Sequence, residues 1–453
     1  MLQKLLALAI IFYYSGSSTN AQSIPPSATT PPSPITPITL DEAIGRAQAV
    51  ETTYGSALAD SGVAAAQRGI ARSVLLPGVV YHNQFLYTQG LSIPVDQSNS
   101  NAKSTSGVRY ISNNAIHEYF SQGVVSETLS GTAVADYKRT NAEAAAAQAR
   151  LEISRRGLVA TVVGFYYSVL SADAKVAVAN EALAEATRFG TITRQREAGG
   201  EVAHADTVKA ELQEQQRKRE LNDAELAADK ARVDLGVLLF PDPTTPYQLA
   251  STLDQLPALP TKADVEAAAK ANNPDLRAAL ESLNAAEYEV TASKFGYLPD
   301  LSLNYFYGID APQFAVHGPD GSRNLGYSAS ATLDIPVWDW FATHNRVKQS
   351  TIRRTQAANE LTLTQRRLIA SLDELYREAS VSQAQMALLD QSVQTAGQSL
   401  RLTNLRYTAG EGTVFEVVDA QNSLVSAESS RADGAVRYYV ALANLQTLTG
   451  TMP

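Results

Sequence analysis

The chain has 453 residues, a formal net charge of −9 and 45% hydrophobic residues. The acidic balance argues against a nucleic-acid partner, since phosphate binding requires clustered Lys and Arg. The sequence contains no cysteine, which excludes disulfides, thiolate metal sites, a cysteine nucleophile and a lipidated N-terminal cysteine. Any attachment to a membrane must therefore come from the fold itself.

The first residues have the pattern of a secretory signal. Lys4 supplies a positive charge, and the apolar run 5–14 is too short to span a bilayer. We predict a signal peptide at 1–22 that ends near Ala21, with a buried N-terminal helix as the alternative. Residues 23–38 are rich in Pro, Ser and Thr and are predicted to form an extended linker. No long apolar run follows, so a mature chain that spans a membrane would have to do so as a closed β-barrel.

Beyond the linker, apolar periodicity and the positions of proline and glycine divide the chain into long helices and short strands. The order is one helix, two strands and two long helices, and it occurs twice. We predict a first repeat at 39–240 and a second at 261–450, separated by a proline-rich linker at 241–260. The predicted helices are 40–76, 131–197 and 203–240 in the first repeat, and 261–296, 340–408 and 413–449 in the second.

Two pairs of matching segments support this internal two-fold repeat. Leu-Pro dipeptides that end at Pro77 and Pro299, 222 residues apart, each follow an alanine-rich helix and precede a strand-like run. The segments REAGGEVAHADTVKAE and RYTAGEGTVFEVVDAQ, which start at Arg196 and Arg406, lie 210 residues apart. A period above about 200 residues indicates a duplicated half-protein and not a solenoid of short repeats.

Four segments are predicted to form strands with one apolar and one polar face. Three of them alternate clearly, and the segment 117–129 is placed by its position alone. We assign Pro77, Pro299 and Pro336 to the junctions between strands and helices. The apolar faces contain Val79, Tyr81, Phe85 and Tyr87; Leu301, Leu303, Tyr305 and Tyr307; and Tyr327, Ala329, Ala331, Leu333 and Ile335.

Aromatic residues gather at these strands. Because aromatic side chains are enriched where a barrel meets lipid headgroups, the candidates for such a girdle are Tyr81, Tyr305, Tyr327, Trp338 and Trp340. A soluble sandwich with a tyrosine-rich core is the alternative. Four strands cannot close a barrel, whose smallest membrane forms have about eight strands. A membrane-spanning sheet therefore requires an oligomer, and a trimer would close it with twelve.

The predicted helices are too long for a compact globular domain. The segment 340–408 contains no proline and only one glycine, Gly397, and at about 1.5 Å per residue it would extend roughly 100 Å. Within it, a coiled-coil seam is indicated by the spacing of Leu361, Leu368, Leu372 and Leu375. We therefore predict dense coiled-coil layers of helices.

Four features resemble the TolC-like outer-membrane efflux protein family. They are TLDEAI at 39–44, the Leu-Pro before the first strand of each half, LDIPVWD at 333–339, and RYxAGxxTxxEVVDAQ at 406–421. The ordered set covers essentially the whole chain after the predicted signal peptide.

The resemblance implies a mixed α and β membrane protein of the outer membrane. Three chains would form a twelve-stranded β-barrel, with four strands from each, continuous with a long α-helical coiled-coil barrel in the periplasm. This homotrimer would be the exit duct of a tripartite efflux system or a type I secretion system. Its partners would be a periplasmic adaptor, an inner-membrane pump and outer-membrane lipid. Loops 91–116 and 310–325 would face the exterior.

The turn between the last two helices is the predicted channel entrance. Gly410 and Gly412 interrupt the helix, and Thr413 is expected to cap the next one, with Glu416 completing a capping box. Glu416 and Asp419 lie three residues apart on one helix face, and three copies of each would form a ring that favours cations. The resemblance also places acidic residues at this constriction. The alternative is that Glu416 only caps the helix and Asp419 is solvated.

The matching turn of the first half contains Gly200 and Asp206, but it has Lys209 where the second half has Asp419. We include Asp206 among the candidate entrance residues, although this difference indicates that the two halves contribute unequally.

The sequence offers no basis for an enzyme, a cofactor or a metal site. Its five histidines are scattered without ligand spacing, and no phosphate-binding glycine-rich loop follows a strand. A coiled-coil surface protein would explain the helices but not the strands, and a periplasmic adaptor would have compact β-domains in place of two-strand insertions. With three methionines and no metal relay, organic solutes are slightly favoured over metal ions as cargo, and a secretion role fits equally well.

Overall fold

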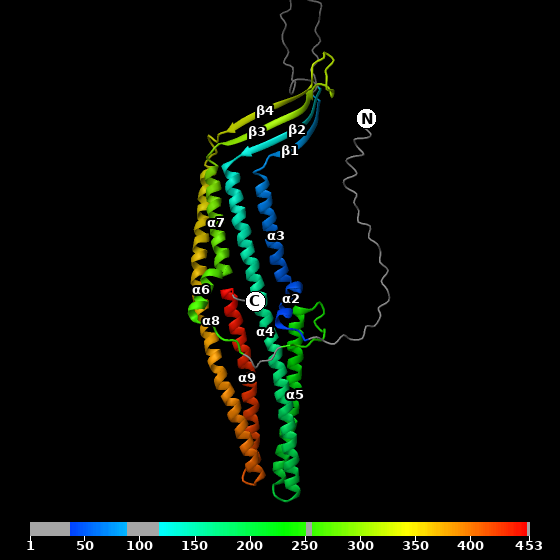
Figure 1. Cartoon of the computed structure of the whole chain (residues 1–453), viewed down its shortest axis with the longest axis vertical. Helices are drawn as coiled ribbons and strands as arrows, with labels where there is room; N and C mark the ends of the chain where they lie inside the picture. Colours follow the sequence, from blue (N-terminus) through cyan, green and yellow to red (C-terminus); the bar gives the residue numbers. More distant parts are fainter. Residues whose placement is uncertain (1–36, 88–116, 251–255, 451–453) are drawn as a thin grey trace, which may run out of the picture.

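The computed structural model describes residues 37–87, 117–250 and 256–450. The chain is elongated, with a sheet at one end and two helical hairpins at the other (Figure 1). The predicted signal peptide, most of the linker predicted at 23–38, loop 91–116 and part of the linker at 241–260 lie outside the described residues.

Two helices, two strands and two long helices follow one another in each half of the chain. The first half comprises α2 (Leu40–Val50), α3 (Thr52–Ser73), β1 (Gly78–Tyr87), β2 (His117–Leu129), α4 (Gly131–Ala198) and α5 (His204–Leu239). The second half comprises α6 (Lys262–Asn272), α7 (Pro274–Phe295), β3 (Asp300–Ala311), β4 (Leu325–Asp334), α8 (Ala342–Thr408) and α9 (Val414–Thr449). The predicted ends of the four longest helices differ from these by at most two residues.

The helices predicted at 40–76 and 261–296 are each a pair of helices, so the prediction of continuous helices was wrong. Glu51 and Asn273 have extended backbone between the two members of each pair. Each side chain accepts a backbone N–H of the following helix, at 2.6 and 2.8 Å. Pro274 then occupies the first helical position, where its missing N–H removes no helical hydrogen bond.

The sheet is antiparallel in the order β1-β2-β3-β4. Its register places Tyr305 opposite Val125 on β2 and Ala329 on β4, so that apolar side chains share one face, as the alternation predicts. The three candidate interface tyrosines are exposed on this face, with exposed fractions of 69% for Tyr81, 44% for Tyr305 and 76% for Tyr327. β1 and β4 are the edges of the sheet.

The strand that position alone predicted at 117–129 is confirmed as β2. Its alternation is weak because Ser121 and Glu127 occupy the apolar face. Ser121 is nevertheless well bonded there, since its hydroxyl bonds to the Tyr81 hydroxyl at 2.8 Å and donates to the Asn83 side chain at 2.8 Å.

The prolines lie where strands meet helices. Pro77 and Pro299 directly precede β1 and β3, whereas Pro336 lies beyond the end of β4, in the connection to α8. The same connection contains Trp338 and Trp340, whose rings pack edge to face with centroids 5.7 Å apart. Both indoles are largely exposed, so they can contact molecules outside the chain at the end of the sheet that adjoins the helices.

α4 and α8 run from the sheet to the far end of the molecule, with α3 and α7 beside them near the sheet and α5 and α9 near the far end (Figure 1). α4 packs against α3, α5, α7 and α9. Small residues allow such close approach, and the buried alanines of α4 include Ala142, Ala144, Ala146 and Ala149. In the seam predicted on α8, Leu368, Leu372 and Leu375 pack against α6 and α9.

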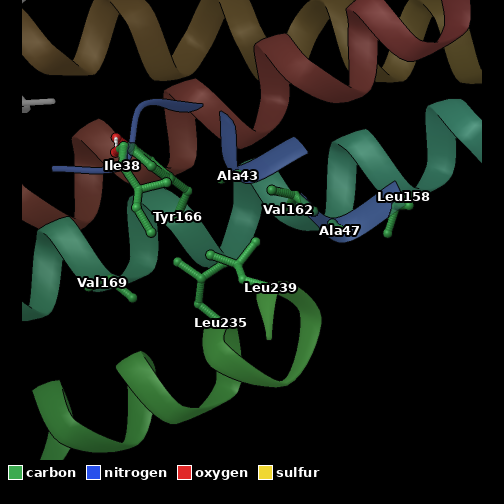
Figure 2. Close-up of a cluster of buried hydrophobic side chains, with 9 residues drawn as sticks. All are labelled: Ile38, Ala43, Ala47, Leu158, Val162, Tyr166, Val169, Leu235 and Leu239. Atoms are coloured by element: carbon green, nitrogen blue, oxygen red, sulfur yellow. Dashed lines mark hydrogen bonds between the residues drawn. The ribbon is translucent and has the colours of Figure 1, made fainter. Parts of the chain in front are cut away.

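A cluster of buried side chains joins α2, α4 and α5 in the middle of the molecule (Figure 2). Its members are Ile38, Ala43, Ala47, Leu158, Val162, Tyr166, Val169, Leu235 and Leu239. The fully buried Tyr166 donates its hydroxyl to the Ile38 carbonyl at 3.0 Å. Among the helices described, α4 alone has the length and apolar content to cross a membrane. This cluster explains that composition, because four residues of α4 belong to it.

Arg156 of α4 joins the end of α9 to the end of α6. Its guanidinium donates to the carbonyl oxygens of Asn272 and Thr447 at 3.2 and 3.3 Å, and to Glu152 at 2.6 Å. Only 7% of Arg156 is exposed. Gly450 has a φ of 74°, a region that favours glycine, and a Cβ there would lie 2.8 Å from the guanidinium, so a larger residue would displace Arg156. We name this arrangement the Arg156 joint, and it fixes the ends of α9 and α6 against α4.

Glu152 makes the Arg156 joint sensitive to acid. The hydrogen bond from Arg155 is the main cause that lowers the pKa of the Glu152 carboxyl; burial opposes it, and the bond from Arg156 adds to it. A carboxyl with a lowered pKa in the folded chain stabilises the fold above its unfolded pKa, and this contribution is lost as the pH falls through the folded value. We expect the Tm to fall more steeply below about pH 4 in the wild type than in Glu152→Gln, as measured by circular dichroism. Parallel pH profiles of the two proteins would contradict this.

Candidate functional site at the ends of the helical hairpins

The hairpins α4–α5 and α8–α9 end next to each other at the pole opposite the sheet (Figure 1). The helices break at the predicted glycines. Gly200 and Gly410 have φ of 76° and 83°, a region that favours glycine. A Cβ on Gly412 would lie 2.9 Å from the backbone nitrogen of Tyr407. Both turns therefore require glycine for their tight return.

Thr413 caps α9 as predicted, because its hydroxyl oxygen accepts the Glu416 N–H at 3.3 Å. Glu416 does not complete the capping box; its carboxylate lies 3.5 Å from the guanidinium of Arg406 instead. At the matching position of the first hairpin, Ala203 makes no side-chain cap to α5. The expectation was therefore right for Thr413 and wrong for Glu416.

α9 brings two of the three candidate carboxylates together. It buries Val414 and Val417, while Glu416 is partly exposed and Asp419 is exposed one turn further on. Asp206 is partly exposed on α5, in the other hairpin. No three His, Asp or Glu side chains converge as a metal site in the part of the chain that the structure describes. The chemistry available at α9 is thus that of anionic, solvent-facing groups.

A contact between the two hairpins was not predicted from the sequence. Tyr407 of α8 is 2% exposed, and its hydroxyl bonds to that of the buried Thr193 on α4 at 3.0 Å. Its ring packs on Phe189, with centroids 4.9 Å apart. Arg196 donates to the Tyr407 carbonyl and lies over its ring, 5.0 Å from the centroid. We name Thr193, Arg196 and Tyr407 the hairpin clasp.

The arginines at matching positions of the two hairpins behave differently. Arg196 reaches across to the second hairpin. Arg406 stays within its own turn, where it faces Glu416 and donates to the Glu411 carbonyl at 3.3 Å. The sequence contained both arginines as landmarks of the repeat, yet only their placement in space distinguishes a link between hairpins from a local contact.

Comparison with known proteins assigns the second half of the chain to a family. Residues 267–451 match the model of the outer membrane efflux protein family. The protein CyaE of Bordetella pertussis is 29% identical over 279 residues, which are 59% of this chain and 57% of the relative. The cobalt-zinc-cadmium resistance protein CzcC of Cupriavidus metallidurans is 26% identical over 287 residues, 62% of this chain and 65% of the relative. The chain thus spans less than two thirds of the length of these curated relatives.

The fold matches over nearly the whole chain. The crystal structure of the CmeC outer membrane channel of Campylobacter jejuni is similar with a TM-score of 0.71 and 18% sequence identity, and the match covers 94% of this chain and 90% of that one. By sequence, residues 267–451 match the outer membrane efflux protein family, and over almost its full length the chain has the fold of outer-membrane channels. These matches support a location in the outer membrane, with an extension into the periplasm.

Proposed function

We propose that three copies of the chain form the exit duct of a tripartite efflux system or of a type I secretion system. Their sheets would join into a twelve-stranded barrel in contact with outer-membrane lipid, and their helices into a long barrel in the periplasm. A periplasmic adaptor and an inner-membrane pump would deliver solutes to the hairpin ends. Because one relative is named for cobalt-zinc-cadmium resistance, metal ions join organic solutes as candidate cargo.

The observation that carries this proposal is that both lateral sides of one subunit are unfinished. β1 and β4 pair on one side only within the described chain, and an unpaired backbone group in lipid costs several kcal/mol. α3 buries none of its residues. Apolar side chains stay exposed at Leu58, Val63 and Ile70 of α3, at Val74 just after it, and at Ile352, Leu363 and Ile369 of α8. Joining β1 and α3 of one copy to β4 and α8 of the next would cover both sides.

We also infer that 39–240 and 261–450 are duplicated units joined by the linker 241–260. The identical order of elements in the two halves supports this inference. Family and fold are those of channel proteins and not of enzymes, and we propose no catalytic role or cofactor for the chain.

We propose that Glu416 and Asp419 make the entrance favour cations, with Asp206 as a weaker contributor. The exposure of Asp419 supports this role, because a charged ring acts on ions only where it faces the pore. Arg406 partly offsets the charge of Glu416, so Asp419 is the stronger determinant of the two. Opening the entrance would require the second hairpin to move away from the first, which would release the hairpin clasp.

The Glu416→Ala, Asp419→Ala double variant is expected to lower the cation selectivity of the channel. In planar bilayers under a salt gradient, its reversal potential should move toward zero, because two carboxylates per subunit leave the entrance. The matched control is Glu374→Ala, Glu378→Ala, which removes two exposed carboxylates from α8 far from the turn. Unchanged reversal potentials in the Glu416, Asp419 variant would reject the entrance assignment.

The proposed assembly is tested by membrane fractionation followed by gel electrophoresis with and without heating. We expect the protein in the outer-membrane fraction, as trimers that separate into single chains only after heating. Chains that stay monomeric and dissolve in water without detergent would overturn the exit-duct proposal.

A further inference from the structure

An acidic pair lies at the end of the sheet that is remote from the helices. Glu118 is near the start of β2, and Asp310 is near the end of β3. The pairing of these strands ends at Tyr119 and Ala311, and Asp310 lies opposite Phe120. Because side chains alternate along a strand, Glu118 and Asp310 share the polar face. They therefore meet diagonally where the ladder between the two halves of the chain ends.

Glu118 is an unusual carboxylate, because it is buried and one of its two oxygens has no hydrogen-bond partner. It is 4% exposed, and its Oε2 has no hydrogen-bond partner. The side chains of Glu118 and Gln122 are both within hydrogen-bonding reach of the Asp310 carboxyl. Burying a carboxylate is costly unless its charge is compensated, and a second carboxylate beside it adds repulsion. A positive charge close to the two carboxyls would therefore stabilise them.

The Asp310 side of the pair has space for that partner. Asp310 and Gln122 line a cavity of about 670 Å³ on the polar face, together with His82, Gln84, Arg323 and Asn324 among others. Arg323 lines the same cavity as Asp310, but among the described residues it forms no ion pair with Glu118 or Asp310. The charge of the pair is therefore open to compensation by a bound ion.

We propose that a hard divalent cation, Ca²⁺ in particular, binds between Glu118 and Asp310. The two carboxylates would supply the charge, the Gln122 amide oxygen a neutral ligand, and water the remaining positions. Ca²⁺ accepts six to eight oxygen ligands in flexible geometry, and sites with few protein ligands bind it at roughly 0.1–1 mM. The site would therefore be occupied where free Ca²⁺ reaches roughly 0.1–1 mM, and it would not capture metal ions that are present only in trace amounts.

The bound ion would fasten the two halves of the chain to each other. Glu118 belongs to the strand pair of the first half and Asp310 to that of the second, and their ladder ends at this point. The location of the site at the outward mouth of a channel rests on the proposed function, whereas the binding of the ion rests only on the sheet.

The test is a calcium titration of the purified full-length protein in detergent after treatment with a chelator. At constant ionic strength, Ca²⁺ is expected to raise the Tm of the wild type and to bind in isothermal titration calorimetry. Glu118→Gln and Asp310→Asn should each weaken binding by about tenfold, or roughly 1.4 kcal/mol. The matched control is Glu127→Gln, since Glu127 is on the same strand and also has an unpartnered Oε2, but it lies on the opposite face.

Three results would overturn the proposal. One is equal binding by the wild type and Glu118→Gln. Another is an equal rise in Tm with Na⁺, which would show screening of charge only. The third is no effect of Ca²⁺ on the wild type while Glu118→Gln alone raises the Tm, which would show that the two carboxyls share a proton. A protein that binds Ca²⁺ but never forms trimers would keep this site and reject the exit duct.

Discussion

Replacing Arg156 with leucine is expected to lower the free energy of unfolding by about 3 kcal/mol. Leucine fills part of the same space but cannot donate to the Asn272 and Thr447 carbonyls or to Glu152, and these groups lie in a site that water reaches poorly. The end of α9 also loses the positive charge that the helix dipole favours there. Denaturant unfolding followed by far-UV circular dichroism measures the loss.

Arg155 is the matched control for this experiment. It bonds to the same Glu152 at 3.0 Å, but its side chain is 35% exposed, and exposed ion pairs contribute at most about 1 kcal/mol. Arg155→Leu should therefore lose far less stability than Arg156→Leu. Equal losses in the two variants would show that contact with Glu152, and not the link between α9 and α6, explains the effect.

Removing the hairpin clasp is expected to favour the open entrance. The double variant Arg196→Ala, Tyr407→Phe loses two hydrogen bonds between hairpins and the cation–π contact, each of which contributes about 1 kcal/mol. Since about 1.4 kcal/mol is a factor of ten, a combined loss of about 3 kcal/mol should raise the ratio of open to closed channels by roughly a hundredfold. Recordings of single channels in planar bilayers should show a longer open time or a larger current.

Arg406→Ala is the control, because Arg406 occupies the matching position of the second hairpin but stays within its own turn. This variant should leave the open time unchanged and increase the preference for cations, since Glu416 loses its positive neighbour. A similar gain in open time in both variants would mean that other contacts hold the hairpins together.

Local patterns predicted most of the architecture. Alternation in β1, β3 and β4 and the absence of proline from α8 are properties of neighbouring residues, so the sequence displays them directly. β2 was harder, because Ser121 is placed on the apolar face by its bonds to Tyr81 and Asn83 on another strand. The breaks at Glu51 and Asn273 were missed because alanine-rich segments on both sides continue the helical pattern across them.

At the ends of the helical hairpins, too, local features were predicted and contacts between distant parts of the chain were not. The turn glycines and the Thr413 cap are local, and the sequence predicted them. The hairpin clasp joins Thr193 and Tyr407, which are 214 residues apart. The Arg156 joint reaches Thr447, which is 291 residues away. No periodicity encodes such contacts, since they depend on how the two hairpins are placed in space.

The exposure of helix α3 affects how a newly made subunit assembles. α3 packs against α4 on one side, but none of its 22 residues is buried within one chain. The rest of its packing comes only by association, and by mass action its stability depends on how many copies are present. Before assembly, a strip of apolar side chains is open to aggregation. Polar substitutions at Ile70 or Val74 would leave the stability of an isolated chain almost unchanged but reduce the yield of assembled protein. Selection at these two positions would therefore act on assembly and not on the fold of one chain.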